Sequence, residues 1–175
     1  MMVIGIISDT HGWLDEAALK HFGEVDAIWH AGDIGSLAVA DALAAVKPLK
    51  AVYGNIDGQE IRSAFPAELL FEVQGLKVLM THIGGLPGRY PASIQQLMEK
   101  HKPDIFVCGH SHILKVTRSG KMLHINPGAA GKHGFHQVRT VVLMTLSGGK
   151  IQHLDVVELG PRTELSTSRS SDTVS

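Results

Sequence analysis

The stretch Val3-Ile4-Gly5-Ile6-Ile7-Ser8-Asp9-Thr10-His11-Gly12 decides the fold class of this chain. Its apolar first half, closed by Ser8-Asp9, is typical of a strand that is buried on both faces. Asp9 and His11 then follow in a loop at the carboxyl end of that strand. The same arrangement, a short apolar strand that ends in a polar loop, recurs along the chain.

The residues that follow alternate between helical and strand patterns. Apolar residues at helical spacing over 13–22, with Gly23 as a stop, predict a helix, and residues 27–30 predict a second strand. A second helix over 37–46 and a third strand over 49–53 continue the alternation. The order β-α-β-α-β predicts parallel strands joined by right-handed crossovers.

Hairpins dominate the second half of the chain. Glycine-containing turns separate pairs of strand-like runs, and one helical pattern covers residues 91–100. We expect hairpins over 69–80, 114–125 and 140–159, with a further strand over 104–108. Together the two halves predict an α/β fold in which helices flank two mixed β-sheets.

Length and composition limit the classes of protein to which the chain can belong. Its 175 residues fit one domain, which we place at 1–160, long enough to bury a core without disulfides. The composition is 44% hydrophobic, and 16 Lys and Arg nearly balance 17 Asp and Glu. These values exclude a disordered chain and nucleic-acid binding driven by net charge. Residues 161–175, rich in Ser and Thr, are expected to form a disordered tail.

The N-terminal residues and the cysteine content bear on location. The N-terminus has no basic region, and its apolar run is too short for a signal peptide or a membrane span. Cys108 is the single cysteine, so it excludes a disulfide within the chain and fits a reducing compartment. We therefore expect a cytoplasmic protein without a membrane partner. The sequence leaves its oligomeric state open.

Polar side chains follow the predicted strands at the points where the strands end. Because the carboxyl ends of parallel strands meet at one edge of a sheet, these side chains are expected to converge. The run Gly109-His110-Ser111-His112 adds two imidazoles after the strand over 104–108. The candidate metal ligands are Asp9, His11, Asp33, Asn55, His82, His110 and His112.

The chemistry of this donor set indicates a pair of divalent metal ions. Oxygen and nitrogen donors without a thiolate suit Mn²⁺, which we expect first, or Ni²⁺, Fe²⁺, Zn²⁺ and Mg²⁺. Seven donors are too many for one ion, whereas a bridging carboxylate would divide them into two groups of four. Two ions about 3.5–4 Å apart can clamp a phosphate and activate a water for its hydrolysis.

Five motifs occur in an order that resembles the calcineurin-like metallophosphoesterase superfamily. The short chain and Gly54-Asn55-Ile56-Asp57 are more narrowly similar to its small bacterial and archaeal phosphodiesterase branch. The resemblance implies a four-layer αββα sandwich with a binuclear metal centre at the strand ends. The other four motifs are Asp9-Thr10-His11, Gly32-Asp33, Thr81-His82 and Gly109-His110-Ser111-His112.

The resemblance also implies how the ligands divide between the ions. Asp33 would bridge, with two oxygens to share between the ions, and the hydroxide between the metals would be the nucleophile. One ion would be held by Asp9, His11, Asp33 and His112, and the other by Asp33, Asn55, His82 and His110.

Two positions depart from the family pattern. Many relatives have histidine after the asparagine, where it stabilises the phosphate or protonates the leaving group, and here the residue is Ile56. A general acid is worth roughly 10²–10⁴-fold, so weak activity is expected on esters with poor leaving groups unless another group substitutes. Asp57 is the candidate, beside Asp33 and Asn55 as catalytic residues; alternatively it accepts hydrogen bonds from its own turn. Ala129 stands where relatives often have serine.

The substrate is expected to be a small phosphoester, more narrowly a phosphodiester, with nucleic acid considered only as a substrate. We expect specificity to depend on the loops over 86–90 and 131–136. The alternative function is that of a scaffold with weak catalysis, like the retromer subunit of the same fold. The candidate substrate contacts are Asn55, Gly128, His133 and Arg139.

Overall fold

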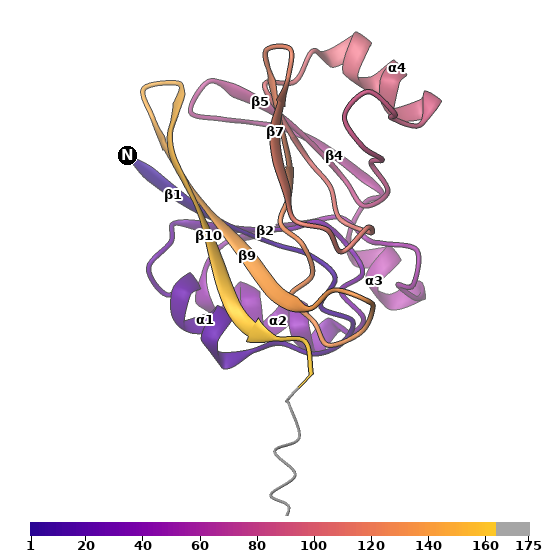
Figure 1. Cartoon of the computed structure of the whole chain (residues 1–175), viewed down its shortest axis with the longest axis vertical. Coiled ribbons are helices and arrows are strands. Elements are labelled where there is room, and N and C mark those ends of the chain that lie inside the picture. The colour runs from indigo at the N-terminus through magenta and orange to yellow at the C-terminus, as the bar shows by residue number, and fades with distance from the viewer. Residues whose placement is uncertain (164–175) are drawn as a thin grey trace, which may run out of the picture.

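Two five-stranded sheets form the centre of the protein, and the computed structural model describes residues 1–163 (Figure 1). The first sheet has the order β10-β9-β1-β2-β3 and the second β4-β5-β6-β8-β7. The first contains β1 (Met2–Ile7), β2 (Ala27–His30), β3 (Leu49–Ala51), β9 (Val138–Ser147) and β10 (Lys150–Pro161). The second contains β4 (Glu68–Val73), β5 (Leu76–Thr81), β6 (Ile105–Val107), β7 (Lys115–Ser119) and β8 (Met122–Asn126).

Both sheets are mixed, as the sequence predicts. β1, β2 and β3 run parallel, and β9 and β10 extend that sheet as antiparallel strands. β5, β6 and β8 run parallel, with β4 and β7 antiparallel at the two edges. The parallel strands lie at the centre of the second sheet, whereas in the first sheet the parallel strand β3 forms one edge. In both sheets the crossovers between parallel strands place helices on the outer face.

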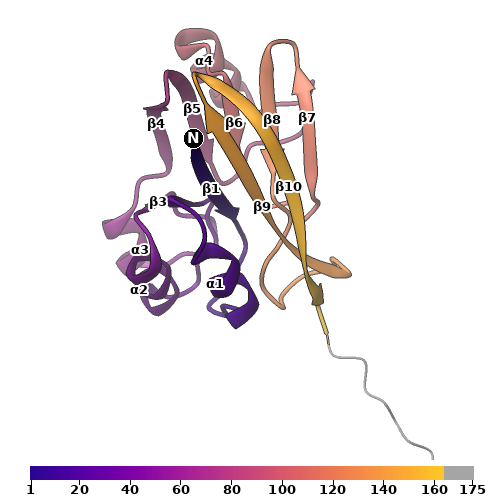
Figure 2. The same ribbon diagram turned by 90° about the vertical axis from the view of Figure 1, so that its left-hand side faces the viewer.

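Helices cover the outer faces and complete four layers (Figure 2). Helices α1 (Glu16–Phe22) and α2 (Leu37–Val46) pack on the first sheet through a cluster that includes Phe22 and Leu43. Helix α4 (Ala92–His101) covers the second sheet through Ile94. Between the sheets lies a third cluster, with Trp29 from one sheet and Met80 from the other. The αββα sandwich is thus confirmed.

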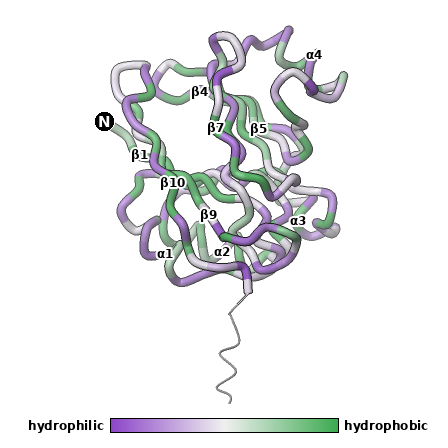
Figure 3. The backbone as a smooth tube through the Cα atoms, viewed as in Figure 1, coloured by the Kyte–Doolittle hydropathy of each residue, from purple (hydrophilic) through white to green (hydrophobic). Residues whose placement is uncertain are grey.

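The first strand shows how its sequence fits these layers. Ile4 and Ile6 point into the core between the sheets, whereas Ile7 packs against the helical layer. Gly5 lies on the helical side, where a Cβ atom would approach the Phe22 ring to 2.5 Å. The glycine is therefore needed for α1 to pack closely on β1. In Figure 3 the central strands carry the hydrophobic colour, whereas hydrophilic colour concentrates in loops and at the ends of the molecule.

Two element boundaries differ from the predictions for local reasons, and one short helix was not predicted. Helix α1 begins at Glu16 because the Asp15 carboxylate caps it, accepting a hydrogen bond of 2.8 Å from the Ala17 amide. Strand β3 ends at Ala51, and the Tyr53 amide donates to Pro66 O at 3.0 Å instead of to β2. Helix α3 (Gln59–Ala64) was not predicted, since its six residues bury only Ile61.

Two observations concern the expected tail and the membrane. Strand β10 continues to Pro161, the first residue of the expected tail. Residues 164–175 of that tail lie outside the described residues. No helix within residues 1–163 is long and apolar enough to cross a membrane.

Candidate metal centre

The seven candidate ligands converge at the carboxyl ends of the parallel strands. Asp9 and His11 follow β1, Asp33 follows β2, and Asn55 follows β3. His82 comes after β5, and His110 and His112 come after β6 of the second sheet. The donor atoms form two groups, Asp9 with His11 and His112, and Asp33 with His82 and His110; within each group the atoms lie within 4.8 Å of one another.

Asn55 joins the second of these groups. Its Oδ1 atom lies 2.9 Å from Nδ1 of His110. The first group therefore offers a carboxylate oxygen with two imidazole nitrogens, and the second offers a carboxylate and an amide oxygen with two imidazole nitrogens. Divalent transition metals prefer these donors. The structure thus brings together all seven predicted ligands in two clusters that face each other at the junction of the two sheets.

The backbone at the ligands is unusual. A φ angle above zero is uncommon outside glycine and costs conformational energy. Seven such residues occur within the described chain, and five are candidate ligands: Asp9, His11, Asp33, His110 and His112, with φ between 47° and 69°. This backbone turns each side chain sharply after its strand, so the strain is concentrated where the donors converge.

Asp9 presents one carboxylate oxygen to the first group. Its Oδ2 accepts hydrogen bonds from Ser8 Oγ at 2.6 Å and from the His110 amide at 3.1 Å. Its Oδ1 is buried without a hydrogen-bond partner among the described residues, and it lies 3.1 Å from His112 Nε2. A buried carboxylate oxygen without a partner is costly, and a cation at this point would satisfy it.

His82 is oriented in the same manner toward the second group. Its Nδ1 donates to Ala31 O at 2.7 Å, which leaves Nε2 as the free nitrogen of the neutral ring. In the described chain this buried Nε2 has no hydrogen-bond partner, and it lies 3.2 Å from Asp33 Oδ2. Burial lowers the pKa of His82, but the Asp33 and Asp9 carboxylates outweigh it, so the net shift is upward. Because a metal binds the neutral imidazole, a metal at Nε2 would compete with a proton for that nitrogen.

Asp33 lies between the two groups. Its Oδ1 accepts a hydrogen bond of 3.1 Å from the Ile56 amide. Its Oδ2 lies 3.6 Å from His11 Nε2 and 3.2 Å from His82 Nε2. Only one oxygen thus faces both groups, whereas the sequence argument assumed that the two oxygens would be shared. Burial raises the pKa of Asp33, but His82 and the Ile56 amide outweigh it and lower the pKa overall.

Asp57 is an acceptor for backbone amides. Its side chain is buried, and it accepts hydrogen bonds from Gly54 N at 2.7 Å, Gly35 N at 2.8 Å and Ile34 N at 3.1 Å. It therefore ties the loop that carries Asp33 to the loop that carries Asn55. This geometry agrees with the alternative in which Asp57 accepts hydrogen bonds from its own turn, and it adds two bonds from a second loop. The Asp57 side chain does not line the cavity described below.

His30 supports the same loops from beneath. Its Nδ1 accepts from the Gly32 amide at 3.1 Å, so its Nε2 donates to Thr10 Oγ1 at 2.9 Å. Thr10 in turn donates to Ile34 O at 2.9 Å. Burial lowers the pKa of His30 to about 4 and keeps the ring neutral. His30 thus links the loop after β1 to the loop after β2.

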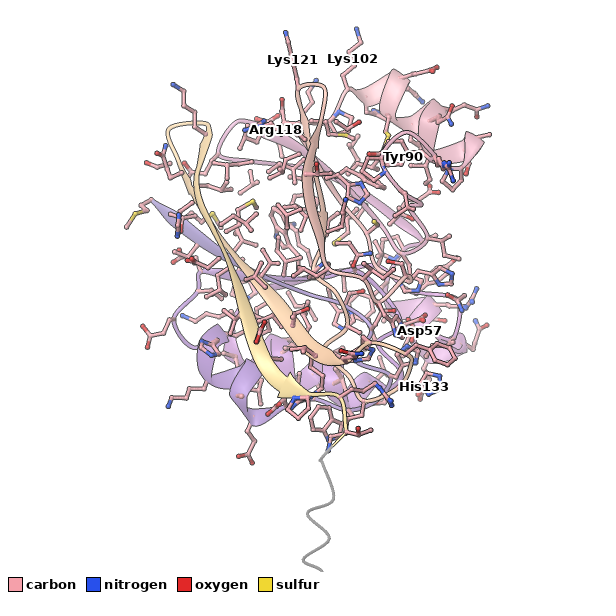
Figure 4. All side chains as sticks on the ribbon, viewed as in Figure 1. Asp57, Tyr90, Lys102, Arg118, Lys121 and His133 are labelled. Atoms are coloured by element: carbon pink, nitrogen blue, oxygen red, sulfur yellow. The ribbon has the colours of Figure 1, made fainter. Side chains whose placement is uncertain are left out.

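A cavity of about 490 Å³ opens over the two groups, a size suited to a small ligand. Of the predicted substrate contacts, Asn55 and His133 line it. His133 stacks on His11, with ring centroids 4.7 Å apart. In Figure 4, His133 and Asp57 lie at the same end of the molecule. The lining residues are His11, Asp33, Asn55, Ile56, His110, Ser111, His112, Ile113, His133, Gly134, Phe135 and His136.

The other two predicted contacts lie away from this cavity. The Arg139 side chain forms an ion pair with Asp15, donates to the carbonyls of Leu159 and Pro161, and lies on the Trp13 ring. Gly128 is buried, and a Cβ atom there would approach Thr140 Oγ1 to 2.3 Å. Both residues therefore have structural contacts instead of access to the cavity.

Six lining residues were among neither the predicted ligands nor the predicted substrate contacts: Ile56, Ser111, Ile113, Gly134, Phe135 and His136. The His136 ring lies 5.3 Å from that of His112, and its Nε2 donates to Gly131 O at 2.8 Å. The sequence feature that could have identified Phe135 and His136 is the loop over 131–136, which contains two glycines. This loop was expected to set specificity, and four of its residues line the cavity. The loop over 86–90 does not.

Comparisons with known proteins agree with this geometry. A probable metallophosphoesterase of Methanothermobacter thermautotrophicus is 30% identical over 133 residues, which cover 73% of this chain and 77% of that protein. A solved archaeal phosphodiesterase is 23% identical with a TM-score of 0.72, covering 90% of this chain and 100% of the other. Vps29 of Chaetomium thermophilum is 18% identical with a TM-score of 0.73, covering 91% and 97%. At these identities the two structures show the likeness of the fold.

The sequence pattern of a known family covers most of the chain. The model of the calcineurin-like phosphoesterase superfamily domain matches residues 2–149, from strand β1 to the turn that precedes strand β10. That range includes all the strand-end loops that carry the two donor groups. The chain therefore belongs to the calcineurin-like phosphoesterase superfamily.

Proposed function

We propose that the protein is a phosphodiesterase that uses two divalent metal ions. The observation that carries this proposal is the position of Asp33 Oδ2, 3.6 Å from a nitrogen of one donor group and 3.2 Å from a nitrogen of the other. Two ions held there would polarise a phosphoryl group and activate water for attack on phosphorus. Mn²⁺ is the ion that we propose first.

The proposed role of each residue follows from its contacts. Asp9, His11 and His112 hold one ion, and Asn55, His82 and His110 hold the other, with Asp33 common to both. Asp33 and Asn55 also define the floor on which the phosphate would lie. Asp57 is proposed as a positioning residue, because all three of its bonds go to backbone amides of the two loops that it joins.

The absence of cationic side chains in the cavity favours a diester. None of the described residues that line it is Lys or Arg. The nearby Lys132 and Arg139 both lie on the Trp13 ring, and Arg62 donates to the carbonyls of Asp57, Gly54 and Asn55. A monoester carries a second negative charge, for which the lining offers histidines but no lysine or arginine beside the metals, whereas a diester carries one charge.

The alternative function, a scaffold with weak catalysis, predicts a metal site that has lost donors. Here every ligand position carries a donor, and the buried atoms Asp9 Oδ1 and His82 Nε2 face the site. We propose separately that the enzyme acts in the cytoplasm. The donor set therefore supports the enzyme over the scaffold.

The test removes the metals and restores them one at a time. The chelated protein is reloaded with Mn²⁺, Ni²⁺, Fe²⁺, Zn²⁺ or Mg²⁺, and hydrolysis of bis-p-nitrophenyl phosphate and p-nitrophenyl phosphate is followed with the bound metal measured. We expect turnover to return with two bound ions and to be faster for the diester. Protein that binds two ions but hydrolyses neither ester with any of them would overturn the proposal.

A further inference from the structure

We propose that an apolar rim around the metal cavity binds a flat aromatic ester group of the substrate. The rim consists of Ile56, Ile113 and Phe135, which line the same cavity as the candidate ligands. The inference rests on the proposed phosphodiesterase function and names the class of diester: one whose second ester group is aromatic.

The exposure of these three side chains is the first observation. Phe135 is 102% exposed, Ile113 63% and Ile56 48%. Single exposed apolar residues are ordinary on a protein surface, but apolar side chains that gather at a polar site mark a binding surface. Ile56 follows β3, Ile113 follows β6, and Phe135 precedes β9. The rim therefore borders the cavity from three separate loops.

The loop that carries Phe135 is held against the metal centre. Gly134 has a φ of 120°, and a Cβ atom there would lie 2.2 Å from His112 Nδ1. On the other side, the Arg162 Nε atom donates to His136 O at 2.9 Å, and His136 Nε2 donates to Gly131 O at 2.8 Å. Phe135 is thus presented beside a candidate ligand by a loop with contacts at both ends.

The charges of the surroundings argue for an apolar occupant of the rim. The described lining contains histidine, asparagine and aspartate at its floor but no lysine or arginine that could hold a second phosphate. Lys102, Arg118 and Lys121 lie at the opposite end of the molecule from His133 (Figure 4). A ring face is a surface on which another flat ring stacks with little demand for hydrogen bonds. The second ester group that fits is therefore aromatic rather than charged.

The test compares two diesters with the same leaving group. Methyl p-nitrophenyl phosphate and phenyl p-nitrophenyl phosphate both release p-nitrophenolate, so their difference, corrected for their rates of alkaline hydrolysis, reports the second ester group. We expect kcat/KM of the metal-loaded protein to favour the phenyl ester by about tenfold, the scale of one aromatic contact, mainly through KM. Thymidine 5′-p-nitrophenyl phosphate then separates a nucleobase from a simple aryl group.

The variants assign this preference to the rim. Phe135→Ala should reduce the phenyl-over-methyl ratio by about tenfold, and Phe135→Tyr should restore it. Leu70→Ala, which shortens a side chain that is 43% exposed away from the cavity, is the matched control and should leave the ratio unchanged. Equal kcat/KM for the two esters, or a ratio that Phe135→Ala leaves unchanged, would overturn the inference.

A binding measurement separates this inference from the proposed function. The affinity of the metal-loaded protein for phenyl phosphate and for methyl phosphate is measured by calorimetry, without turnover. Tighter binding of phenyl phosphate that Phe135→Ala removes supports the rim even if no ester is hydrolysed, in which case the proposed function alone fails. Equal affinities for the two phosphates would overturn the inference even in an active enzyme.

Discussion

The floor and the rim of the cavity differ in almost every physical respect. Three of the candidate ligands, Asp9, Asp33 and His82, are at most 2% exposed and form what we call the floor from here on, whereas Ile56, Ile113 and Phe135 at the rim are at least 48% exposed. Each floor side chain has a hydrogen bond that fixes its direction: Asp9 accepts from Ser8 Oγ, Asp33 accepts from the Ile56 amide, and His82 donates to Ala31 O. The rim side chains are apolar and have no hydrogen-bonding group that could fix them in this way. The floor is built to hold charge at defined points, and the rim is built to present apolar surface.

This contrast teaches where tolerance to change should lie. A side chain that is fixed by a hydrogen bond at one atom keeps its metal-facing atom in one position. The chemistry should therefore depend on each floor residue. A rim residue contributes contact area, and its loss should alter which ester is preferred more than the rate of the chemical step. Substitutions at the two levels should therefore have effects of different size and kind.

The largest effect is expected at the residue shared by the two donor groups. Asp33→Asn removes the negative charge between them, and activity should fall by more than about 10³-fold. The fold should be retained, because the amide oxygen can still accept from the Ile56 amide. Activity and bound metal per protein are measured together, with circular dichroism as the control for folding. Wild-type turnover with two bound ions would contradict the bridging position of Asp33.

A smaller effect, on metal affinity, is expected at Asp57, which binds the backbone of the loops that carry Asp33 and Asn55. Asp57→Asn replaces an acceptor of three amides by a side chain that carries donors, and metal affinity should fall by roughly 10–100-fold. A positioning role predicts that the shape of the pH–rate profile is kept once metal is saturating. Loss of the alkaline limb of that profile with normal metal affinity would instead indicate that Asp57 is the proton donor.

The buried His30 beneath the floor should make stability depend on pH. Burial lowers its folded pKa to about 4, below its ordinary value of 6.5. The unfolded chain then binds the extra proton, so this stability is complete above pH 6.5 and is lost as pH falls toward 4. At pH 5 the loss should be about 2 kcal/mol.

Urea unfolding of the metal-free protein at pH 7 and pH 5 measures that loss. His30→Gln should reduce the difference in unfolding free energy between the two pH values by about the same amount. His153→Gln, at a site where the imidazole is exposed, is the matched control and should leave it unchanged. An equal difference in His30→Gln and wild type would show that the buried ring is not the source.

The smallest effect is expected where the rim meets the floor. Ile56→His places an imidazole on the cavity lining, and it should increase kcat for diesters with poor leaving groups by up to about tenfold, below the full value of a positioned general acid. The increase should grow with the pKa of the leaving group. A series of substituted phenyl esters measures this dependence, and the same slope in wild type and variant would count against a missing acid at position 56.

Much of the fold and the donor set could be predicted from the sequence. Periodicity and turn residues predicted both halves of the sandwich, with boundaries that differ at Asp15, which caps α1, and at Tyr53, where the chain leaves β2. Helix α3 was not predicted because six residues with one buried side chain show little hydrophobic periodicity. The convergence of the candidate ligands could be predicted because they follow strands in the sequence, so their position along the chain already implies their position in space.

The sequence by itself determined the α/β class and the family, and it singled out seven candidate donors, because residue type and order are local properties. Only the tertiary structure decided that Asp57 binds amides of a loop 23 residues away, and that Arg139 pairs with Asp15 124 residues away. It also decided that Asp33 offers a single oxygen to both groups, and that Phe135 lies at the metal cavity. The physical reason is that these outcomes depend on which polar groups packing brings within hydrogen-bond distance, and residues distant in sequence carry no local pattern for that contact.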